Sequence, residues 1–370
     1  MPHYQQLTEL QSLKTYLDSE YYRDIVENSA INILPGNQPP WQSTNITLNK
    51  GDEFSLFALG RIAWSDKRPD LYGGPGFHLW ARINPGGRIK NITAETGSFI
   101  ADTNGTLEIG IYMGMWATEF GELVHQDHYS RLSGEITVVS VIWRKDAHHS
   151  LRQTIHPGPT PPLLWQERGR IDQNYQPPEG WTYLNETGHT DIFHLRTDSH
   201  GTGAQRKLIY LDAQSNQGII RFPVNFPLTE QLTLSWQWRL DEHPSLGPED
   251  RADCHDYVSV AAEFDNGRDL TWIWSRHLAQ DHHFHCPVKD WTSRETHYVV
   301  RTPDDPIGSW VSETRDVHSD VLKSQGTPPA NVTAIWLIAV STFSHGRIRA
   351  SYRNIEIAEK LSGKKLKTIL

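Results

Sequence analysis

The sequence predicts an all-β protein made of two tandem β-sandwich domains of the jelly-roll or galactose-binding type, preceded by one N-terminal helix. Three observations support this prediction. Short segments in which apolar and polar residues alternate recur along the 370 residues, and this period is typical of half-buried strands. Gly, Asn, Asp and Pro separate the segments, as in sandwiches. The length fits two domains, and a proline-dense stretch divides the chain.

Residues 1–30 are expected to hold the N-terminal helix. Leu7, Leu10, Leu13, Leu17 and Tyr21 recur at helical spacing and form one apolar stripe. We expect this stripe to pack against a sheet.

Residues 31–145 are expected to form the first sandwich. Strands are predicted within residues 52–64, 77–83, 107–112 and 135–143, with a Gly/Pro-rich loop at 70–76.

This first domain resembles the galactose-binding bacterial lectins of the PA-I type over about 110 residues. Those lectins hold calcium through a tyrosine after the first long strand and an Asp/Thr/Asn set further on. Trp64 and Gly114 stand at the tyrosine and aspartate positions, and calcium requires clustered oxygen ligands. The resemblance therefore implies the lectin fold and departs from the family at its calcium site. The matching segments are residues 49–54, 58–60, 76–83, 95–97, 109–112 and 133–141.

Residues 146–163 read as a linker, because His148, His149 and His156 are followed by Pro157-Gly-Pro-Thr-Pro-Pro162. Proline density of this kind disfavours regular structure. The histidines could bind a metal, but a solvated linker is the more frequent explanation.

Residues 164–358 are expected to form the second sandwich, followed by a basic tail at 359–370. Leu232–Leu240 alternates strictly, so its leucines and tryptophans share one face. This domain resembles the DUF3047 family, which is jelly-roll-like and has no established chemistry, so the resemblance implies the fold alone. It departs from the family at residues 340–346. The matching segments are residues 234–241, 256–257, 264–265, 270–274, 310–316, 328–338 and 352–357.

The net charge of −9 argues against a nucleic-acid partner, and no apolar run is long enough to insert into a membrane. Met1 does not open a signal peptide, yet five Asn-x-Thr sequons occur. We expect a mature, secreted glycoprotein; chance matches in a cytosolic protein are the alternative. In a secreted chain Cys254 and Cys286 would form one disulfide, with a reduced pair as the alternative. The sequons are at Asn45, Asn91, Asn104, Asn185 and Asn331.

Candidate catalytic residues come from the second domain. Arg239, Glu263 and Arg276 lie at polar positions of predicted strands, with Glu313 and Arg315 on a neighbouring one. An outer-face ladder of charges is one interpretation; a polar site for an oxygenated ligand is the other.

The histidines near this stretch are His255, His277, His282, His283 and His285, and His277 and His283 are the proposed acids or donors. Their spacing fixes no third ligand, so no metal is expected.

Aromatic residues of both domains are predicted to line a pocket between them, although core packing is the most frequent role of any single one. The proposed substrate-binding residues are Trp64, Trp80, Trp116, Tyr257, Trp272, Trp274 and Trp310, with Trp291 and Trp336 beside them.

The sequence contains no nucleophile elbow, P-loop, dinucleotide fingerprint or metalloprotease helix. We therefore expect a cofactor-free cyclase or pericyclase of secondary metabolism that orients a hydrophobic small molecule. The architecture resembles that of fungal hetero-Diels–Alderases of tropolone–sesquiterpenoid pathways, which implies a cycloaddition. A secreted carbohydrate-binding or glycan-active protein is the alternative. No cofactor is expected, and a homodimer is possible.

Overall fold

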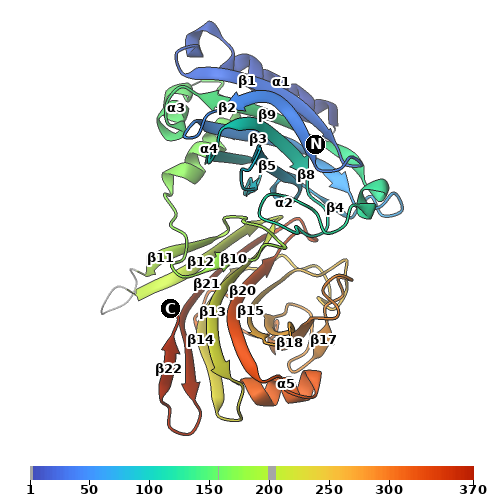
Figure 1. Cartoon of the computed structure of the whole chain (residues 1–370), viewed down its shortest axis with the longest axis vertical. Coiled ribbons are helices and arrows are strands. Elements are labelled where there is room, and N and C mark those ends of the chain that lie inside the picture. The colour runs from blue at the N-terminus through green and yellow to red at the C-terminus, as the bar shows by residue number, and fades with distance from the viewer. Residues whose placement is uncertain (1–2, 157, 199–205) are drawn as a thin grey trace. The chain divides into compact units, whose positions relative to one another are not determined.

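A computed structural model describes residues 3–156, 158–198 and 206–370. The chain divides into two compact units (Figure 1). The N-terminal unit comprises Met1–Asn174 and Asn185–Thr190, and the C-terminal unit comprises Tyr175–Leu184 and Asp191–Leu370. Both are built mainly of antiparallel sheets, so the predicted all-β class is confirmed. Among the described residues, no helix is both long and apolar enough to cross a membrane.

The predicted N-terminal helix is shorter than expected. Helix α1 (His3–Leu17) buries Leu10, Leu13 and Leu17, but Tyr21 is 72% exposed. At Ser19 the backbone is extended (φ −64°, ψ 149°), and a short 3₁₀ helix, η1 (Glu20–Tyr22), follows. The helical period ends there, and Tyr22 is buried instead of Tyr21.

Two sheets enclose the core of the N-terminal unit. Leu56, Ala58, Ile136 and Val138 face the second sheet across this core. The first sheet has the order β1 (Val26–Pro35), β9 (Ser133–Trp143), β3 (Glu53–Ala63) and β4 (Tyr72–Gly73), with β7 (Thr96–Ile100) paired to β3; the second has the order β2 (Trp41–Leu48), β8 (Gly105–Ile111), β5 (Leu79–Asn84) and β6 (Lys90–Asn91). Two short helices, α2 (Pro75–His78) and η2 (Asp127–Arg131), lie in the connections.

The stretch expected to be a linker contributes helices to this unit. Helices α3 (Ala147–Thr154) and α4 (Pro162–Asp172) flank its prolines. The Asp146 carboxylate accepts the His149 backbone N–H at 2.7 Å and caps α3, and Pro162 stands in the first turn of α4, where its missing N–H costs nothing. Leu151 and Leu164 join α1 on the outer face of the first sheet.

The C-terminal unit is a larger sandwich. Its sheets are antiparallel except where β16 and β18 run parallel. Seven strands form one sheet in the order β10 (Thr182–Tyr183), β13 (Gln217–Pro227), β20 (Asn331–Val340), β15 (Tyr257–Phe264), β16 (Asp269–Trp274), β18 (Glu295–Arg301) and β17 (His283–His285). Six form the other: β11 (Phe193–Asp198), β12 (Arg206–Gln214), β21 (Arg347–Glu359), β14 (Leu232–Glu242) and β19 (Val311–Asp316), with β22 (Lys365–Thr368) paired to β21. Helix α5 (Val317–Gln325) follows β19.

Tryptophans fill the space between these two sheets. Trp236 and Trp238 of β14 point inward, as their alternation predicts, and meet Trp272 and Trp274 of β16. The ring centroids are 5.7 Å apart for Trp236–Trp272 and 5.3 Å for Trp238–Trp274. Contacts of this kind add about 0.5–1.5 kcal/mol per pair to the burial of the rings.

The outer faces of the two sheets differ. That of the seven-stranded sheet carries a second apolar cluster that includes Ile273, Val299 and Trp336, with Phe284 and Trp291 from the β16–β18 connection packed on it. That of the six-stranded sheet carries charged and half-exposed side chains. One face is therefore covered by the chain, and the other presents polar groups.

Candidate functional site

The outer face of the six-stranded sheet gathers arginines, carboxylates and aromatic rings. Alternation explains the arrangement: Ile209 and Leu211 of β12 point into the core, so Tyr210 and Asp212 point out. We call this surface the arginine face. It comprises Tyr175, Arg196, Tyr210, Asp212, Gln237, Arg239, Asp241, Glu242, Trp310, Arg347, Arg349 and Arg353.

The arginine face carries paired charges. Arg347 Nε and Nη2 donate to the two oxygens of Asp212 at 2.7 and 2.6 Å, a bidentate pair. Arg349 Nε donates to Glu242 at 2.9 Å. Arg239 Nε donates to Asp241 at 2.7 Å. Each pair thus presents N–H donors and carboxylate acceptors side by side.

Aromatic rings lie at both sides of these pairs. The Arg196 guanidinium lies 3.5 Å from the centroid of Tyr210 and 4.7 Å from that of Tyr175. On the other side, the Arg353 guanidinium lies 3.9 Å from the centroid of Trp310. All three rings are half-buried, so part of each remains in contact with solvent.

The electrostatics keep the charges of the face fixed. The hydrogen bonds that Arg347 donates to the Asp212 carboxylate raise the pKa of Arg347. Burial, with the neighbouring Asp212 charge, raises the pKa of Tyr210, so its phenol stays neutral. The groups of this face offer hydrogen bonding and stacking to a ligand.

A second constellation lies buried beside the seven-stranded sheet. One donor atom from each of His255, Cys286, Glu295 and His297 lies within 4.8 Å of the others. Burial and the nearby His297 lower the pKa of His255 to about 3, which keeps its imidazole neutral. Burial raises the pKa of Glu295, but the nearby His297 outweighs that effect and lowers it to about 2. These are side chains that can hold a metal ion.

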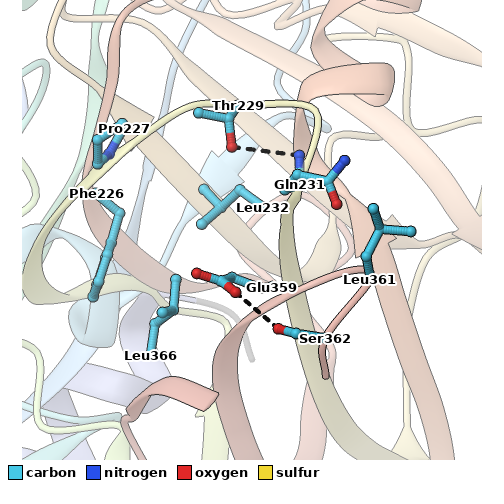
Figure 2. A pocket seen from close by; sticks show the side chains of 9 residues that line it. All are labelled: Phe226, Pro227, Thr229, Gln231, Leu232, Glu359, Leu361, Ser362 and Leu366. Carbon is cyan, nitrogen blue, oxygen red and sulfur yellow. Dashed lines mark hydrogen bonds between the residues drawn. The ribbon is translucent and has the colours of Figure 1, made fainter. Parts of the chain in front are cut away.

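Figure 2 shows a pocket of about 530 Å³ where the turn between β13 and β14 meets the turn between β21 and β22. Two hydrogen bonds join polar groups of its lining: Thr229 Oγ1 accepts the Gln231 N–H at 3.3 Å, and Ser362 Oγ donates to Glu359 at 2.8 Å. None of the predicted site residues lines it. The lining residues are Phe226, Pro227, Thr229, Gln231, Leu232, Glu359, Leu361, Ser362 and Leu366.

The structure does not bring Arg239 and Glu263 together. Arg239 lies on the arginine face, whereas Glu263 lies on the outer side of the seven-stranded sheet, where it accepts from Arg221 at 2.6 Å and from Trp336 Nε1 at 3.0 Å. The inward neighbours of both residues, including Leu240 and Ala262, fill the common core, so the two charges point away from each other.

The other predicted catalytic residues lie in or near the β16–β18 connection. The Arg276 backbone N–H donates to Glu249 at 2.7 Å. His277 Nε2 lies 3.0 Å from the Ser245 carbonyl. His283 is exposed on β17 and stacks on Tyr298 with centroids 5.9 Å apart. Glu313 and Arg315 point inward instead of sharing the polar face: Glu313 accepts from Trp238 Nε1 at 3.2 Å, and Arg315 pairs with the buried Asp320.

Most of the predicted substrate-binding aromatics serve the cores. Trp80 and Trp116 are buried in one aromatic cluster of the N-terminal unit, and Trp272 and Trp274 lie between the sheets of the C-terminal unit. Trp64 is half-buried and donates to His78 at 2.9 Å, and Tyr257 is buried and donates to Glu295 at 3.2 Å. Trp310 is half-exposed on the arginine face.

The predicted disulfide is absent: both Cys254 and Cys286 are free thiols. The physical reason is the direction of Cys286, whose Sγ lies 3.6 Å from His255 Nε2. Of the sequons, Asn91 is buried and its amide donates to the Leu79 carbonyl at 3.1 Å, which leaves no room for a glycan. Asn45, Asn104 and Asn185 are exposed and Asn331 is half-buried, and their modification stays a prediction.

Sequence reasoning missed Glu295 and His297, which supply the further ligands that the histidine spacing lacked. Glu295-Thr-His297 was a usable signal, because residues two apart on a strand share a face. On the arginine face, the pairing of β12 with β21 was needed to bring Asp212 beside Arg347, and no local pattern records that pairing.

Comparison with known proteins gives one family. Residues 181–356 match the model of a family described as a protein of unknown function, DUF3047. This agrees with the resemblance in the sequence and covers most of the C-terminal unit. The search of curated proteins finds no match.

Several solved structures are similar at low identity. The N-terminal domain of EclA, a PllA-like lectin, is 14% identical, with 32% of this chain and 98% of that chain covered and a TM-score of 0.26. The xyloglucanase domain of NopAA from Sinorhizobium fredii, in complex with cellobiose, is 12% identical over 50% of this chain and 100% of that chain, with a TM-score of 0.30. A family 30 carbohydrate-binding module of Clostridium thermocellum is 13% identical over 50% and 95%, with a TM-score of 0.28. Similarity this low carries no argument about function.

Proposed function

We propose that this protein binds a carbohydrate on the arginine face of its C-terminal unit. The observation that carries the proposal is the set of pre-formed arginine–carboxylate pairs lying between half-exposed aromatic rings on one side of one sheet.

The chemistry of the face matches that of a sugar. Each sugar hydroxyl is both a donor and an acceptor, as a serine hydroxyl is. The Asp212–Arg347 and Glu242–Arg349 pairs offer donors and acceptors next to each other, so adjacent hydroxyls can bind both kinds of group. The C–H face of a sugar ring is apolar and packs on an aromatic surface such as Tyr210 or Trp310.

The pairs also hold their side chains in place before a ligand arrives. Arg353 lies over Trp310 while its Nε donates to Gln237 at 2.9 Å. Ordering a free side chain on binding costs about 0.5–1.5 kcal/mol, so groups already ordered favour affinity. Stability alone does not explain the array, since exposed ion pairs contribute only about 0–1 kcal/mol each.

The test is to screen the full-length protein against an array of oligosaccharides and to measure the hits by titration calorimetry. Tyr210→Ala and Arg349→Ala should each weaken binding at least about tenfold, which corresponds to about 1.4 kcal/mol. Arg221→Ala is the matched control. It breaks the Arg221–Glu263 pair on the outer side of the other sheet, where the arginine is also partly exposed (32%, against 43% for Arg349).

Two outcomes would contradict the proposal. One is a wild-type protein that binds no oligosaccharide on the array or in solution. The other is a set of hits whose affinity is the same in wild type, Tyr210→Ala and Arg349→Ala, which would place binding elsewhere.

The cyclase hypothesis stays a prediction, as does the architectural resemblance to hetero-Diels–Alderases. It required aromatic side chains that line a substrate pocket, whereas Trp80, Trp116, Trp272 and Trp274 are packed in cores. Secretion, a small-molecule substrate and a homodimer likewise stay predictions.

A further inference from the structure

Four buried side chains converge where two irregular segments meet the edge of the seven-stranded sheet. His255 lies near the end of the β14–β15 connection, two residues before β15, and Cys286 directly follows β17. Glu295 and His297 are both on β18 and point to the same side of it. All four are at most 3% exposed.

Two of the six distances between their donor atoms already have the values of a tetrahedral metal site. His255 Nε2 lies 3.6 Å from Cys286 Sγ, and His297 Nε2 lies 3.4 Å from Glu295 Oε2. Zinc bonds of about 2.0–2.3 Å at tetrahedral angles place neighbouring ligand atoms roughly 3.3–3.6 Å apart. The remaining pairs, all within 4.8 Å, need only a small closure.

Surrounding hydrogen bonds orient two of the ligands. His255 Nδ1 lies 3.2 Å from the Glu249 carbonyl, to which it donates, and this leaves the lone pair of Nε2 directed at the cluster. Glu295 Oε1 accepts from Tyr257 at 3.2 Å and from Thr271 at 3.5 Å, so Oε2 is left for the site. Metal-binding histidines and carboxylates are held in this way.

His297 is an independent indication. It is fully buried, and neither ring nitrogen makes a hydrogen bond; Nδ1 has no polar partner, and Nε2 has only the Glu295 Oε2 atom at 3.4 Å. A buried polar group left without a partner costs about 1–3 kcal/mol, and such groups are rare in folded proteins. A metal ion bound to Nε2 satisfies the atom that faces the other three ligands.

We propose that His255, Cys286, Glu295 and His297 bind one Zn²⁺ in a closed structural site. Two imidazoles, one thiolate and one carboxylate are ligands that zinc accepts, whereas calcium and magnesium select oxygen ligands. Binding displaces the Cys286 thiol proton to solvent. The ion then neutralises the thiolate and the Glu295 carboxylate, so the buried site carries no net charge.

Four protein ligands leave no open position for a substrate, which is the arrangement of structural rather than catalytic zinc. The ion would fasten the β14–β15 connection and the segment after β17 to β18. In this role the ion would take the place of the disulfide expected from the sequence.

The test uses full-length protein without a polyhistidine tag. Wild-type protein should contain one zinc per chain by inductively coupled plasma mass spectrometry. After removal of zinc with a chelator its unfolding temperature should fall, and added Zn²⁺ should restore it. Co²⁺ in place of zinc should give the intense visible bands of a tetrahedral site and a thiolate-to-cobalt charge-transfer band.

Variants assign the ligands. Cys286→Ser should lose stoichiometric zinc and the charge-transfer band, while Cys254→Ser, the matched control at the other free thiol, should keep both. Tyr257→Phe removes only the hydrogen bond to Glu295 and should lower zinc affinity about 10–100-fold. This variant keeps the core ring, so it tests the site even where Cys286→Ser fails to fold.

The proposal is overturned by wild-type protein that contains no zinc after growth with added zinc and gives no cobalt spectrum. It is also overturned by Cys286→Ser protein with the zinc content and spectrum of wild type. Because the site lies apart from the arginine face, glycan binding is a separate measurement, and either proposal can fail alone.

Discussion

Among the residues that the structure describes, one histidine in each unit is completely buried, and the two have opposite surroundings. His78 of the N-terminal unit accepts from Trp64 Nε1 at 2.9 Å, and its Nδ1 donates to the Tyr112 carbonyl at 2.6 Å. His297 of the C-terminal unit has no hydrogen-bond partner on either nitrogen and faces Glu295 and a thiol.

The difference shows that burial alone does not indicate a functional histidine. His78 uses both of its nitrogens within the fold, so nothing further is needed to explain it. Burying His297 without hydrogen bonds destabilises the fold, and a bound cation would offset that penalty. The partners of the two ring nitrogens, rather than the exposure of the side chain, distinguish a packed histidine from a ligand.

The largest expected effect comes from His297→Leu. In the presence of zinc this variant should be at least about 3 kcal/mol less stable than wild type, because it removes a ligand from a buried charged site. In chelator the difference should shrink to within about 1 kcal/mol, since leucine also removes two buried nitrogens that make no hydrogen bond. Urea unfolding of both proteins under both conditions measures the two differences.

If the difference in unfolding free energy between wild type and His297→Leu is the same with zinc and in chelator, His297 is a packing residue like His78. The contrast between the two histidines would then be wrong. His283→Gln, on the exposed strand β17, serves as the control, and we expect it to change stability little under either condition.

The next effect is the pH dependence due to His78. Burial, only partly offset by the hydrogen bond to Tyr112, lowers its pKa from the usual 6.5 to about 4. Between pH 4 and pH 6.5, His78 is therefore protonated in the unfolded chain and neutral in the folded chain. The contribution of neutral His78 to the free energy of unfolding is fully present above pH 6.5, and about 3 kcal/mol of it is lost as the pH drops to 4.

His78→Gln isolates this contribution, because an amide can also accept from Trp64 and donate to Tyr112 without titrating. Urea unfolding from pH 4 to pH 7 should show a steeper loss for wild type than for His78→Gln within this window. If the unfolding free energies of the two proteins change in parallel with pH, His78 is protonated in the folded protein as readily as in the unfolded chain.

Local alternation was enough to predict the elements and much of the core. The alternation of Leu232–Leu240 predicted strand β14 and placed its tryptophans on the core face. The prediction from sequence failed where the arrangement of side chains depends on which distant strands pair with each other. Arg239 and Glu263 both occupy polar positions of predicted strands, but their strands belong to different sheets, so the supposed cluster divides between two opposite faces.

The zinc ligands show the same limit. Glu295 and His297 form a visible pair on one strand. Cys286 and His255 lie in irregular segments, whose path cannot be predicted from the spacing of apolar residues. Two cysteines in a chain with sequons favoured a disulfide, and only the directions of the side chains in the fold reveal that Cys286 faces a histidine instead.

The smallest effect on stability is expected on the arginine face, because its charges are exposed to water and those of the His297 site are buried. Glu242 and Arg349 are each 43% exposed, so water replaces the partner that Glu242→Ala removes. Unfolding should change by less than about 1 kcal/mol, while the affinity for an oligosaccharide hit should fall, because a carboxylate acceptor and a fixed arginine are lost together. A loss of more than about 2 kcal/mol in stability with unchanged binding would instead make this face part of the scaffold. Measuring both quantities on the same preparation decides between a surface kept for a ligand and one kept for the fold.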